Sequence, residues 1–248
     1  MSKISVIIPN YNHAPYLKER IDSVLNQTFQ DFEVIILDDK STDNSREIIE
    51  QYRNHPKISH IIYNEVNSGS TFKQWNKGIE LAKSEWIWIA ESDDTAEPTL
   101  LETLVSGAEK KQETVLAYCQ SNRMDSSGTI TGDWLNHTQN HKRNFFEDFY
   151  ENGKEFIVQD LIHRNVIPNA SAVILKKEAF LKAEKTDEDI RYNSDWLLWM
   201  KILLFGNVYF STQKLNNFRY HNKSVIASSS KNEALPFKRK YDIVMMER

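Results

Sequence analysis

Three short runs of polar residues each come directly after an apolar, β-branched segment. They are PNYN at residues 9–12, DD at residues 38–39 and ESDD at residues 91–94. In an open parallel sheet the carboxyl ends of the strands meet at one edge, and ligands bind there. The five carboxylates of these runs would repel one another at that edge unless a cation or a donor-rich ligand compensated them. Mg²⁺ and Mn²⁺ take oxygen ligands and commonly share them with substrate phosphates, so we expect a metal-bound diphosphate here.

Acidic residues after a strand have a second interpretation, because Asp is a preferred N-cap of the helix that follows. The pair at residues 38–39 alone is therefore weak evidence, whereas the repetition at successive strand ends favours a site. Glycine-based nucleotide motifs are missing from the sequence, which has 7 Gly, no G-x-G-x-x-G after the first strand and no G-x-x-x-x-G-K-[ST]. A dinucleotide-dependent dehydrogenase and a P-loop enzyme are thus disfavoured.

The segments that position these runs alternate between buried-strand and amphipathic-helix patterns. In the first half we predict strands at residues 4–8, 32–37, 58–63, 86–90 and 115–120. Helices are predicted between them, at residues 15–27, up to residue 52, 71–83 and 98–110. This βαβαβαβαβ order predicts an α/β fold with right-handed crossovers, a mostly parallel Rossmann-like sheet and helices on both of its faces.

The second half of the sequence is less regular. We predict helices at residues 154–162, 178–183 and 194–204, a strand at 172–175, a small antiparallel pair at 208–210 and 215–220, and a polar loop at 133–144. The predicted organisation is one continuous domain with two halves, residues 1–122 and 123–227, followed by a C-terminal helical tail at residues 228–248.

Composition excludes several other classes of protein. The 248 residues include 40% hydrophobic and 27% charged residues, which is typical of a soluble globular protein. The net charge of −4 argues against a general nucleic-acid binder, which needs a basic surface. The single cysteine, Cys119, cannot form an internal disulfide, which favours a reducing compartment. Since no apolar run is long enough to span a bilayer, we expect a cytoplasmic protein.

Several segments resemble the successive signatures of family-2 glycosyltransferases, which have the nucleotide-sugar-binding fold called GT-A. In the first half they are ISVIIPNY at residues 4–11, FEVIILDDKSTD at 32–43, NSG at 67–69 and WIWIAESDD at 86–94. The resemblance resumes with SDWLLWMKILL at 194–204 and RYHNKS at 219–224. It implies an inverting, metal-dependent transferase of bacterial-type surface polysaccharide synthesis. The donor would be a nucleotide-diphospho-sugar, with UDP or dTDP favoured, and the acceptor a saccharide or lipid-linked saccharide.

The resemblance also implies which residues bind the donor. Pro9 and Tyr11 would line the nucleobase pocket, with the Tyr11 ring against the base. Asp39 would accept a hydrogen bond from the base, as a carboxylate suits the imide N–H of uracil or thymine. The family's loop and helix that approach the donor correspond to Asn67, Gly69 and Lys73. Lys73 would either offset phosphate charge or remain a solvated helix residue.

The ESDD run occupies the Asp-x-Asp position of the family, so the resemblance implies that it holds Mn²⁺ or Mg²⁺. Asp93 is the first choice for the metal ligand, with Asp94 beside it as a second candidate, and Ser92 could contribute its hydroxyl. Glu91 is one methylene longer than the usual first Asp. The family analogy gives its position to the ribose or to a contact behind the metal ligands.

His221 matches a histidine that some relatives use as a further metal ligand or diphosphate contact, although a lone histidine is more often structural. Mn²⁺ accepts an imidazole more readily than Mg²⁺ does. Arg219 would contact phosphate. The basic run at residues 238–240 is either a solvated helix face or a weak attraction to anionic lipid.

Asp195, at the start of a predicted helix, corresponds to the general base of the family. In an inverting transfer the acceptor hydroxyl loses a proton as it attacks the anomeric carbon, and a positioned carboxylate takes that proton. A metal ion stabilises the departing diphosphate, so no protonated leaving-group acid is required. Without the resemblance, Asp195 is a first-turn residue that the helix dipole favours.

Two alternative functions stay open. A non-catalytic sugar-nucleotide-binding protein is suggested by the departure at Glu91. A sugar-nucleotide nucleotidyltransferase shares the general fold, but we would expect a loop with Gly and Arg after its first strand. The sequence IPNYNHA at residues 8–14 has neither.

Overall fold

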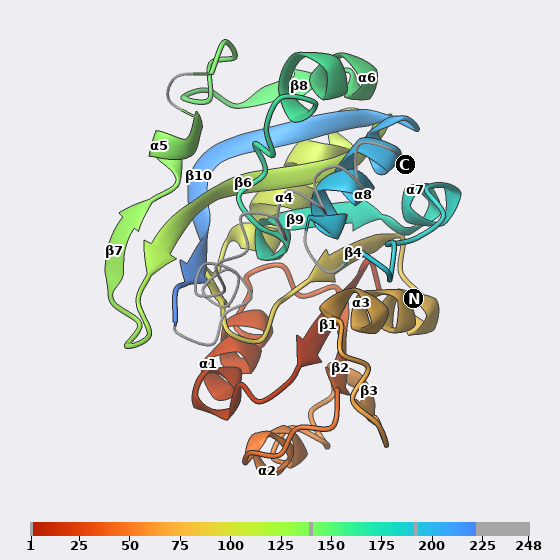
Figure 1. Ribbon diagram of the computed structural model, residues 1–248, viewed down its shortest axis with the longest axis vertical. Coiled ribbons are helices and arrows are strands. Elements are labelled where there is room, and N and C mark those ends of the chain that lie inside the picture. Colours follow the sequence, from red (N-terminus) through yellow and green to blue (C-terminus); the bar gives the residue numbers. More distant parts are fainter. Residues whose placement is uncertain (1, 139–140, 191–192, 222–248) are drawn as a thin grey trace.

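Within the part of the chain that the structure describes, ten strands form one mixed sheet (Figure 1). The structure is a computed structural model, and it describes residues 2–138, 141–190 and 193–221. The strands lie in the order β3-β2-β1-β4-β9-β6-β10-β5, with β7 beside β6 and β8 beside β10. Their bounds are β1 Ile4–Asn10, β2 Phe32–Asp38, β3 Ile58–Tyr63, β4 Trp86–Ile89, β5 Thr95–Ala96, β6 Thr114–Met124, β7 Ile130–Asp133, β8 Phe149–Glu151, β9 Val173–Lys176 and β10 Asn207–Arg219.

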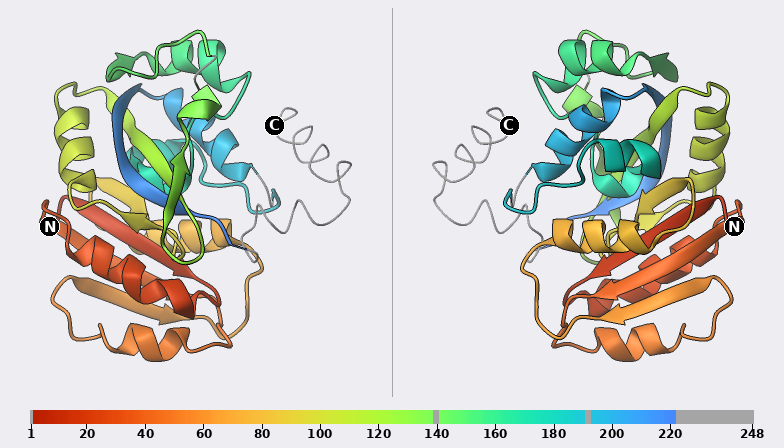
Figure 2. Two further views of the ribbon diagram at one scale, coloured as in Figure 1. Left: turned by 90° about the vertical axis from the view of Figure 1, so that its left-hand side faces the viewer. Right: turned by 90° about the vertical axis from the view of Figure 1, so that its right-hand side faces the viewer.

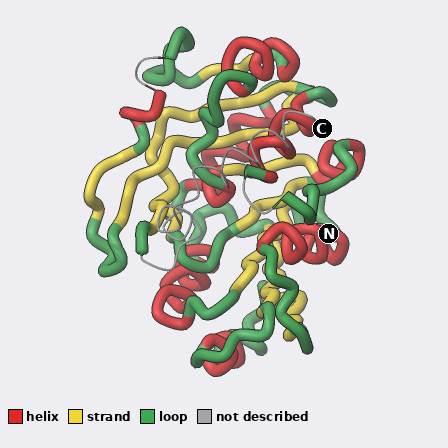
Figure 3. Tube along the Cα trace, viewed as in Figure 1, coloured by secondary structure: helices red, strands yellow, loops and turns green. Residues whose placement is uncertain are grey.

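The helices surround this sheet, as the colouring by secondary structure shows (Figure 3). Their bounds are α1 Ala14–Leu25, α2 Ser45–Glu50, α3 Thr71–Leu81, α4 Leu100–Glu109, α5 Leu135–Thr138, α6 Gly153–Phe156, α7 Lys177–Lys182 and α8 Ser194–Leu203, with a π-helical turn at Ile157–Leu161 and a 3₁₀ turn at Ala170–Ala172. The predicted tail at residues 228–248, its basic run and the end of the RYHNKS segment lie outside the described residues.

The strands β1 to β4 form the parallel part of the sheet, and the prediction for this part is confirmed. β1 pairs in parallel with β2 on one side and with β4 on the other. Every residue of β1 is buried. Successive side chains of a strand point to opposite faces. Accordingly, Ile7 packs in one apolar core, while Val6 and Ile8 pack in the other.

Helices cover both faces of the sheet, as predicted. Apolar side chains of α1 and α4, such as Ile21 and Leu104, fill the core on one face. Those of α3 and α8, such as Trp75 and Trp199, fill the core on the other. The two side views show α1 in front of the strands in one and α3 in front in the other (Figure 2). α3 approaches β1 closely because it carries Gly78, where a Cβ would lie 2.5 Å from Ile7 Cγ2.

The second half departs from the prediction at β10. The predicted antiparallel pair at residues 208–210 and 215–220 is wrong, because this segment forms one continuous strand that runs parallel to β6. Register shifts flank Lys214, where polar residues interrupt the apolar pattern without turning the backbone. The predicted loop at 133–144 contains the short helix α5 in its described part. β9 inserts between β4 and β6 and is antiparallel to both, so strands of both halves share one sheet.

Candidate functional site

The loop at residues 91–94, here called the ESDD loop, follows β4 at the edge where β1 and β2 also end. β4 and β2 are the two parallel neighbours of β1. Asn10 Nδ2 donates a hydrogen bond to Asp38 Oδ2 over 2.8 Å. The backbone N–H of Asp39 donates to the carbonyl oxygen of Asn10 over 2.9 Å. The three polar runs of the sequence therefore meet at one edge of the sheet.

A group of potential metal ligands lies on one side of the ESDD loop. His13, Asp93 and His221, here called the His–Asp–His cluster, offer ligand atoms that all lie within 4.8 Å of one another. A hydrogen bond of 2.9 Å joins His221 Nε2 and Asp93 Oδ2. A second, of 2.8 Å, joins His13 Nδ1 and Ser92 Oγ. Ser92 therefore orients a histidine of the cluster, as outer partners of metal-binding histidines do.

The cluster borders a cavity of about 680 Å³. His13 of the β1–α1 connection and Tyr16 of α1 line it, together with Asp125, Tyr220 and His221. This volume is in the range of small-molecule sites. Two imidazoles and one carboxylate are a donor set that suits Mn²⁺ better than Mg²⁺, because Mg²⁺ prefers oxygen ligands alone.

The charges around Asp93 favour its ionised form. Burial pushes the pKa of Asp93 upward, but the hydrogen bond from His221 and the positive charge that His13 and His221 carry when protonated bring it below its ordinary value. An ionised carboxylate is the form that binds a cation. The geometry of this side of the loop therefore fits a divalent metal ion, which would bind once both histidines are neutral.

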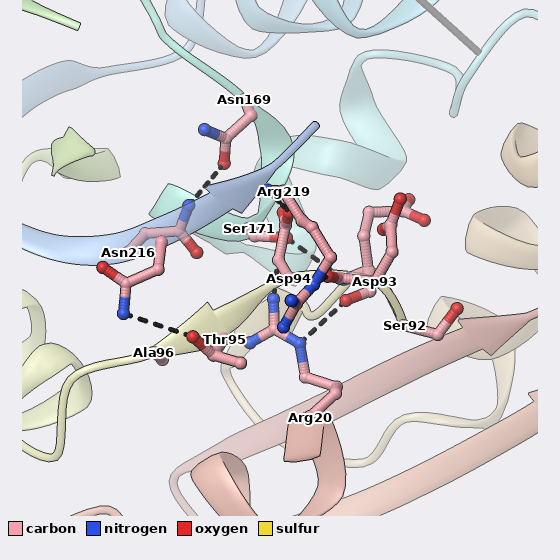
Figure 4. Close-up of polar contacts among 12 residues, drawn as sticks. Arg20, Ser92, Asp93, Asp94, Thr95, Ala96, Asn169, Ser171, Asn216 and Arg219 are labelled. Atoms are coloured by element: carbon pink, nitrogen blue, oxygen red, sulfur yellow. Dashed lines mark hydrogen bonds and ion pairs between the residues drawn. The ribbon is translucent and has the colours of Figure 1, made fainter. Parts of the chain in front are cut away.

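The other side of the ESDD loop is held by two arginines, here called the arginine pair (Figure 4). Arg219 donates from its backbone N–H to Asp94 Oδ1 over 2.9 Å and from Nε to the carbonyl oxygen of Asp93 over 2.7 Å. Arg20 donates from Nε to the carbonyl oxygen of Glu91 over 2.7 Å. Its Nη2 lies 3.9 Å from Asp94 Oδ2. Asp94 thus faces the arginine pair, and its metal-binding role stays a prediction.

The guanidinium of Arg219 is also engaged away from the loop. It donates to Glu19 Oε2 and to the carbonyl oxygen of Asp125, and it lies over the Tyr16 ring with Cζ 4.7 Å from the ring centroid. Only 1% of Arg219 is exposed. In this arrangement Arg219 joins β10 to α1 and to the ESDD loop, and its predicted phosphate contact stays a prediction.

Glu91 points to a different neighbour from Asp93 and Asp94. Its carboxylate accepts a hydrogen bond of 2.6 Å from Trp75 Nε1 and one of 3.1 Å from Thr71 Oγ1, both on α3. Burial, and then the charge of Asp93, raise the pKa of Glu91 to about 8. Glu91 therefore connects the ESDD loop to α3.

Asp39 holds the loop that precedes α3. Its two carboxylate oxygens accept hydrogen bonds from the backbone N–H of Ser68, over 2.9 and 3.0 Å, and from Ser68 Oγ, over 2.7 Å. Asn64 Nδ2 and Gln74 Nε2 also donate to Asp39, over 2.6 and 3.1 Å. Asp39 therefore orders this loop, and its hydrogen bond to a nucleobase stays a prediction.

Most of the other predicted donor residues lie near Asp39. Tyr11 is 47% exposed just beyond the buried Pro9 at the end of β1. Asn67 Nδ2 donates to the carbonyl oxygen of Asp39, and its Oδ1 accepts from the N–H of Gly69, which has a φ of +72°. Lys73 is exposed on α3. Their contacts with a donor stay predictions.

Asp195 lies in the first turn of α8, and burial raises its pKa above the ordinary value. Trp199 lies four residues further on, which places it on the same face of the helix. Trp199 is fully buried and packs against Trp75 of α3, with ring centroids 6.3 Å apart. Trp196 donates from Nε1 to the carbonyl oxygen of Leu161 over 2.8 Å. The face of α8 that carries Asp195 therefore turns toward the α3 residues that contact the ESDD loop.

The sequence analysis did not identify two residues of this site. His13 lies in a connection with no periodic pattern, and its proximity to His221 arises only because the end of β10 lies beside the ESDD loop. Arg20 had a detectable signal, because it stands on the apolar face of α1 beside Leu17, Ile21 and Val24. A charged residue at such a position is rarely buried unless it is paired. Arg20 is fully buried.

Comparison with known proteins identifies the family. The family described as glycosyl transferase family 2 matches residues 5–166. Glycosyltransferase GlyG of Streptococcus pneumoniae is 29% identical over 236 residues, which cover 90% of this chain and 72% of GlyG. The putative teichuronic acid biosynthesis glycosyltransferase TuaG of Bacillus subtilis is 26% identical over 229 residues, covering 92% of this chain and 83% of TuaG.

Solved structures agree on the fold. The structure of S. aureus TarS residues 1–349 in complex with UDP-GlcNAc aligns with a TM-score of 0.72 at 21% identity, covering 91% of this chain. The chain spans 61% of that TarS fragment. Among the described residues, none of the helices has the length and apolarity to cross a bilayer. The family match, which extends over more than half of the sequence, confirms the resemblance: the chain belongs to glycosyl transferase family 2 and has the GT-A fold.

Proposed function

We propose that this protein is an inverting, metal-dependent glycosyltransferase of bacterial surface polysaccharide synthesis. It would transfer a sugar from a UDP-linked donor to a saccharide or lipid-linked acceptor. The observation that carries the proposal is the His–Asp–His cluster beside a cavity at the carboxyl ends of the parallel strands. TuaG, named for teichuronic acid synthesis, supports the pathway, and the UDP-GlcNAc complex of TarS supports UDP over dTDP.

The metal ion would be held by His13, Asp93 and His221, with Mn²⁺ favoured by the two imidazoles. When bound, it would neutralise charge on the diphosphate leaving group. Ser92 would keep His13 in the orientation that binding requires, through the hydrogen bond between Oγ and Nδ1. The nucleobase would pack against the exposed ring of Tyr11.

Asp195 would act as the general base. The bond between the anomeric carbon and the diphosphate oxygen breaks as the acceptor oxygen bonds to the opposite side of that carbon. The proton of the acceptor hydroxyl passes to the Asp195 carboxylate, and the configuration inverts. Burial raises the pKa of Asp195, which makes its carboxylate a stronger proton acceptor than an exposed one.

The test is transfer activity with a panel of UDP- and dTDP-sugars, Mn²⁺ and saccharide acceptors. The parent is expected to release nucleoside diphosphate, and Asp195→Asn is expected to lower kcat by about 10²–10⁴-fold, as loss of a general base does. With the parent, the acid limb of the pH–rate profile is expected above the ordinary Asp pKa, because the base must be deprotonated. Unchanged activity in Asp195→Asn would refute the base assignment. Tight UDP binding without turnover of any donor would favour the non-catalytic alternative.

The proposed location is the cytoplasmic side of the membrane. A peripheral lipid contact is proposed for the tail at residues 228–248, which carries the basic run. Flotation of the protein with vesicles that contain anionic lipid tests this contact. Binding that disappears in vesicles of neutral lipid is the expected result.

A further inference from the structure

Glu91 makes contacts that an aspartate at the same position would not reach. Its carboxylate lies 2.6 Å from Trp75 Nε1 and 3.1 Å from Thr71 Oγ1. Trp75 cannot move to meet a shorter side chain, because it is 2% exposed and its ring packs edge-on against Phe72 with centroids 5.0 Å apart. The extra methylene of Glu91 therefore spans the gap between the ESDD loop and α3.

The indole of Trp75 carries this contact on to α8. Its ring stacks on Trp199 with an interplanar angle of 28° and a centroid separation of 6.3 Å. Trp199 is fully buried, so the stacked pair is fixed on both sides by the core. Asp195 stands one helical turn before Trp199 on the same face of α8. Because the ring is fixed, its hydrogen bond to Glu91 holds the ESDD loop at a set position relative to the helix that carries Asp195.

We propose that Glu91 is a positioning residue that couples the metal-binding loop to the helix of the general base through Trp75 and Trp199. In this role it contacts neither the metal ion nor the ribose of the donor. The carboxylate of Glu91 acts as a hydrogen-bond acceptor of sufficient reach, which explains why Glu stands where the family usually has Asp. The inference rests on the proposed function, because it takes Asp195 as the base.

Three variants test this proposal. Glu91→Asp shortens the side chain, Trp75→Phe removes the N–H donor but keeps a ring, and Glu91→Gln keeps both the length and an acceptor oxygen. Trp86→Phe is the matched control. Trp86 is equally buried, at the start of β4 in the other core, and its Nε1 finds no hydrogen-bond partner among the described residues.

We expect Glu91→Asp and Trp75→Phe to lower kcat by about 10–100-fold, since a misplacement of about 1 Å has effects of this size. The KM for the donor and the affinity for Mn²⁺ should remain close to those of the parent. Glu91→Gln should lower kcat far less, and the kcat of Trp86→Phe should match that of the parent. A Glu91→Gln variant that raises the donor KM well above that of the parent would overturn the proposal, because Glu91 would then act on the donor directly.

Two further measurements need no substrate. The near-ultraviolet circular dichroism of the stacked Trp75–Trp199 pair should change in Glu91→Asp and persist in Glu91→Gln. In thermal unfolding, the double variant of Glu91→Asp and Trp75→Phe should be as stable as the less stable of the two single variants. Each substitution removes the same hydrogen bond, so the second adds no further loss. Additive losses with an unchanged spectrum would overturn the coupling even if transfer is observed. The predicted spectrum and coupling without transfer by the parent would instead contradict only the proposed function.

Discussion

The two sides of the ESDD loop place identical residue types in opposite surroundings. Asp93 lies in a cluster with His13 and His221, which line a cavity, whereas its neighbour Asp94 faces the buried arginine pair. The hydrogen bond from His221 and the nearby positive charge, which outweigh burial, lower the pKa of Asp93, while burial and the charge of Asp93 raise the pKa of Asp94 to about 7. We therefore expect Asp93 to bind a ligand and Asp94 to attach the loop to the core. Four experiments test this division.

The largest effect is expected for Asp93→Asn on the cavity side. Loss of a carboxylate ligand removes a metal contribution of several kcal/mol, so transfer should fall by about 10³-fold or more. The melting temperature without added metal should fall only slightly, because asparagine keeps an acceptor oxygen for the hydrogen bond with His221. Activity assays and thermal unfolding in EDTA check the two parts. A large loss of stability would show that Asp93 also supports the loop.

On the core side, Arg20→Met should destabilise the fold by about 3–5 kcal/mol, because removal of one partner leaves the other buried charge uncompensated. It also removes the hydrogen bond to the carbonyl oxygen of Glu91. Denaturant unfolding measures the change, and Arg53→Met, at an exposed arginine of the ion pair with Glu50, is the control. If Arg20→Met were as stable as the control, the charge of Arg20 would not be needed to compensate the buried Asp94 carboxylate.

The next effect concerns His13, which distinguishes this cluster from a site made of Asp93 and His221 alone. His13→Ala should weaken Mn²⁺ binding by more than the 10–100-fold that loss of an outer partner causes, because a direct ligand is removed. Ser92→Ala, which only removes the hydrogen bond that orients His13, should weaken Mn²⁺ binding by about 10–100-fold. Calorimetric titration with Mn²⁺ measures both. Equal affinities of His13→Ala and the parent would remove His13 from the metal site.

The smallest effect is on the pH dependence of stability, measured in EDTA. A carboxyl whose folded pKa is raised contributes its full stabilisation below its unfolded pKa and loses it as the pH rises. The stability that Asp94 contributes should therefore decrease between about pH 4 and 7. Asp93, with a lowered pKa, should do the reverse, and its contribution should disappear only as the pH falls below about 4. Asp94→Asn should flatten the first slope and Asp93→Asn the second. If the melting temperature changes with pH in the same way in both variants between pH 3 and 8, the division is contradicted.

Much of the parallel part of the fold could be predicted from the sequence, because its strands are buried on both faces and are separated by amphipathic helices. The strand at residues 172–175 was also predicted. Its position between β4 and β6 was not, since antiparallel insertion from the second half leaves no trace in local periodicity. At β10 the polar residues around Lys214 resembled a turn, although the backbone remains extended through a register shift.

The candidate site could likewise be predicted only in part. Asp93 and Asp195 were predicted because they stand in recognisable segments of the family. The surroundings that decide what each carboxylate does come from side chains far away in the sequence. Arg219 is 126 positions from Asp93, to whose carbonyl oxygen it donates, and His221 is 128 positions from Asp93. Such contacts follow from topology, which a single sequence does not display.

The insertion of β9 has a consequence for how the chain acquires its structure during synthesis. Until residue 176 has left the ribosome, β4 and β6 lack the strand that joins them, and each exposes an unpaired edge. The middle of the sheet is therefore completed late, when β9 pairs with β4 and β6. Pairing between segments that are distant in sequence is a slow class of folding step. We expect nascent chains that end shortly after β6 to depend on chaperones, and those that extend beyond β10 to be released from them.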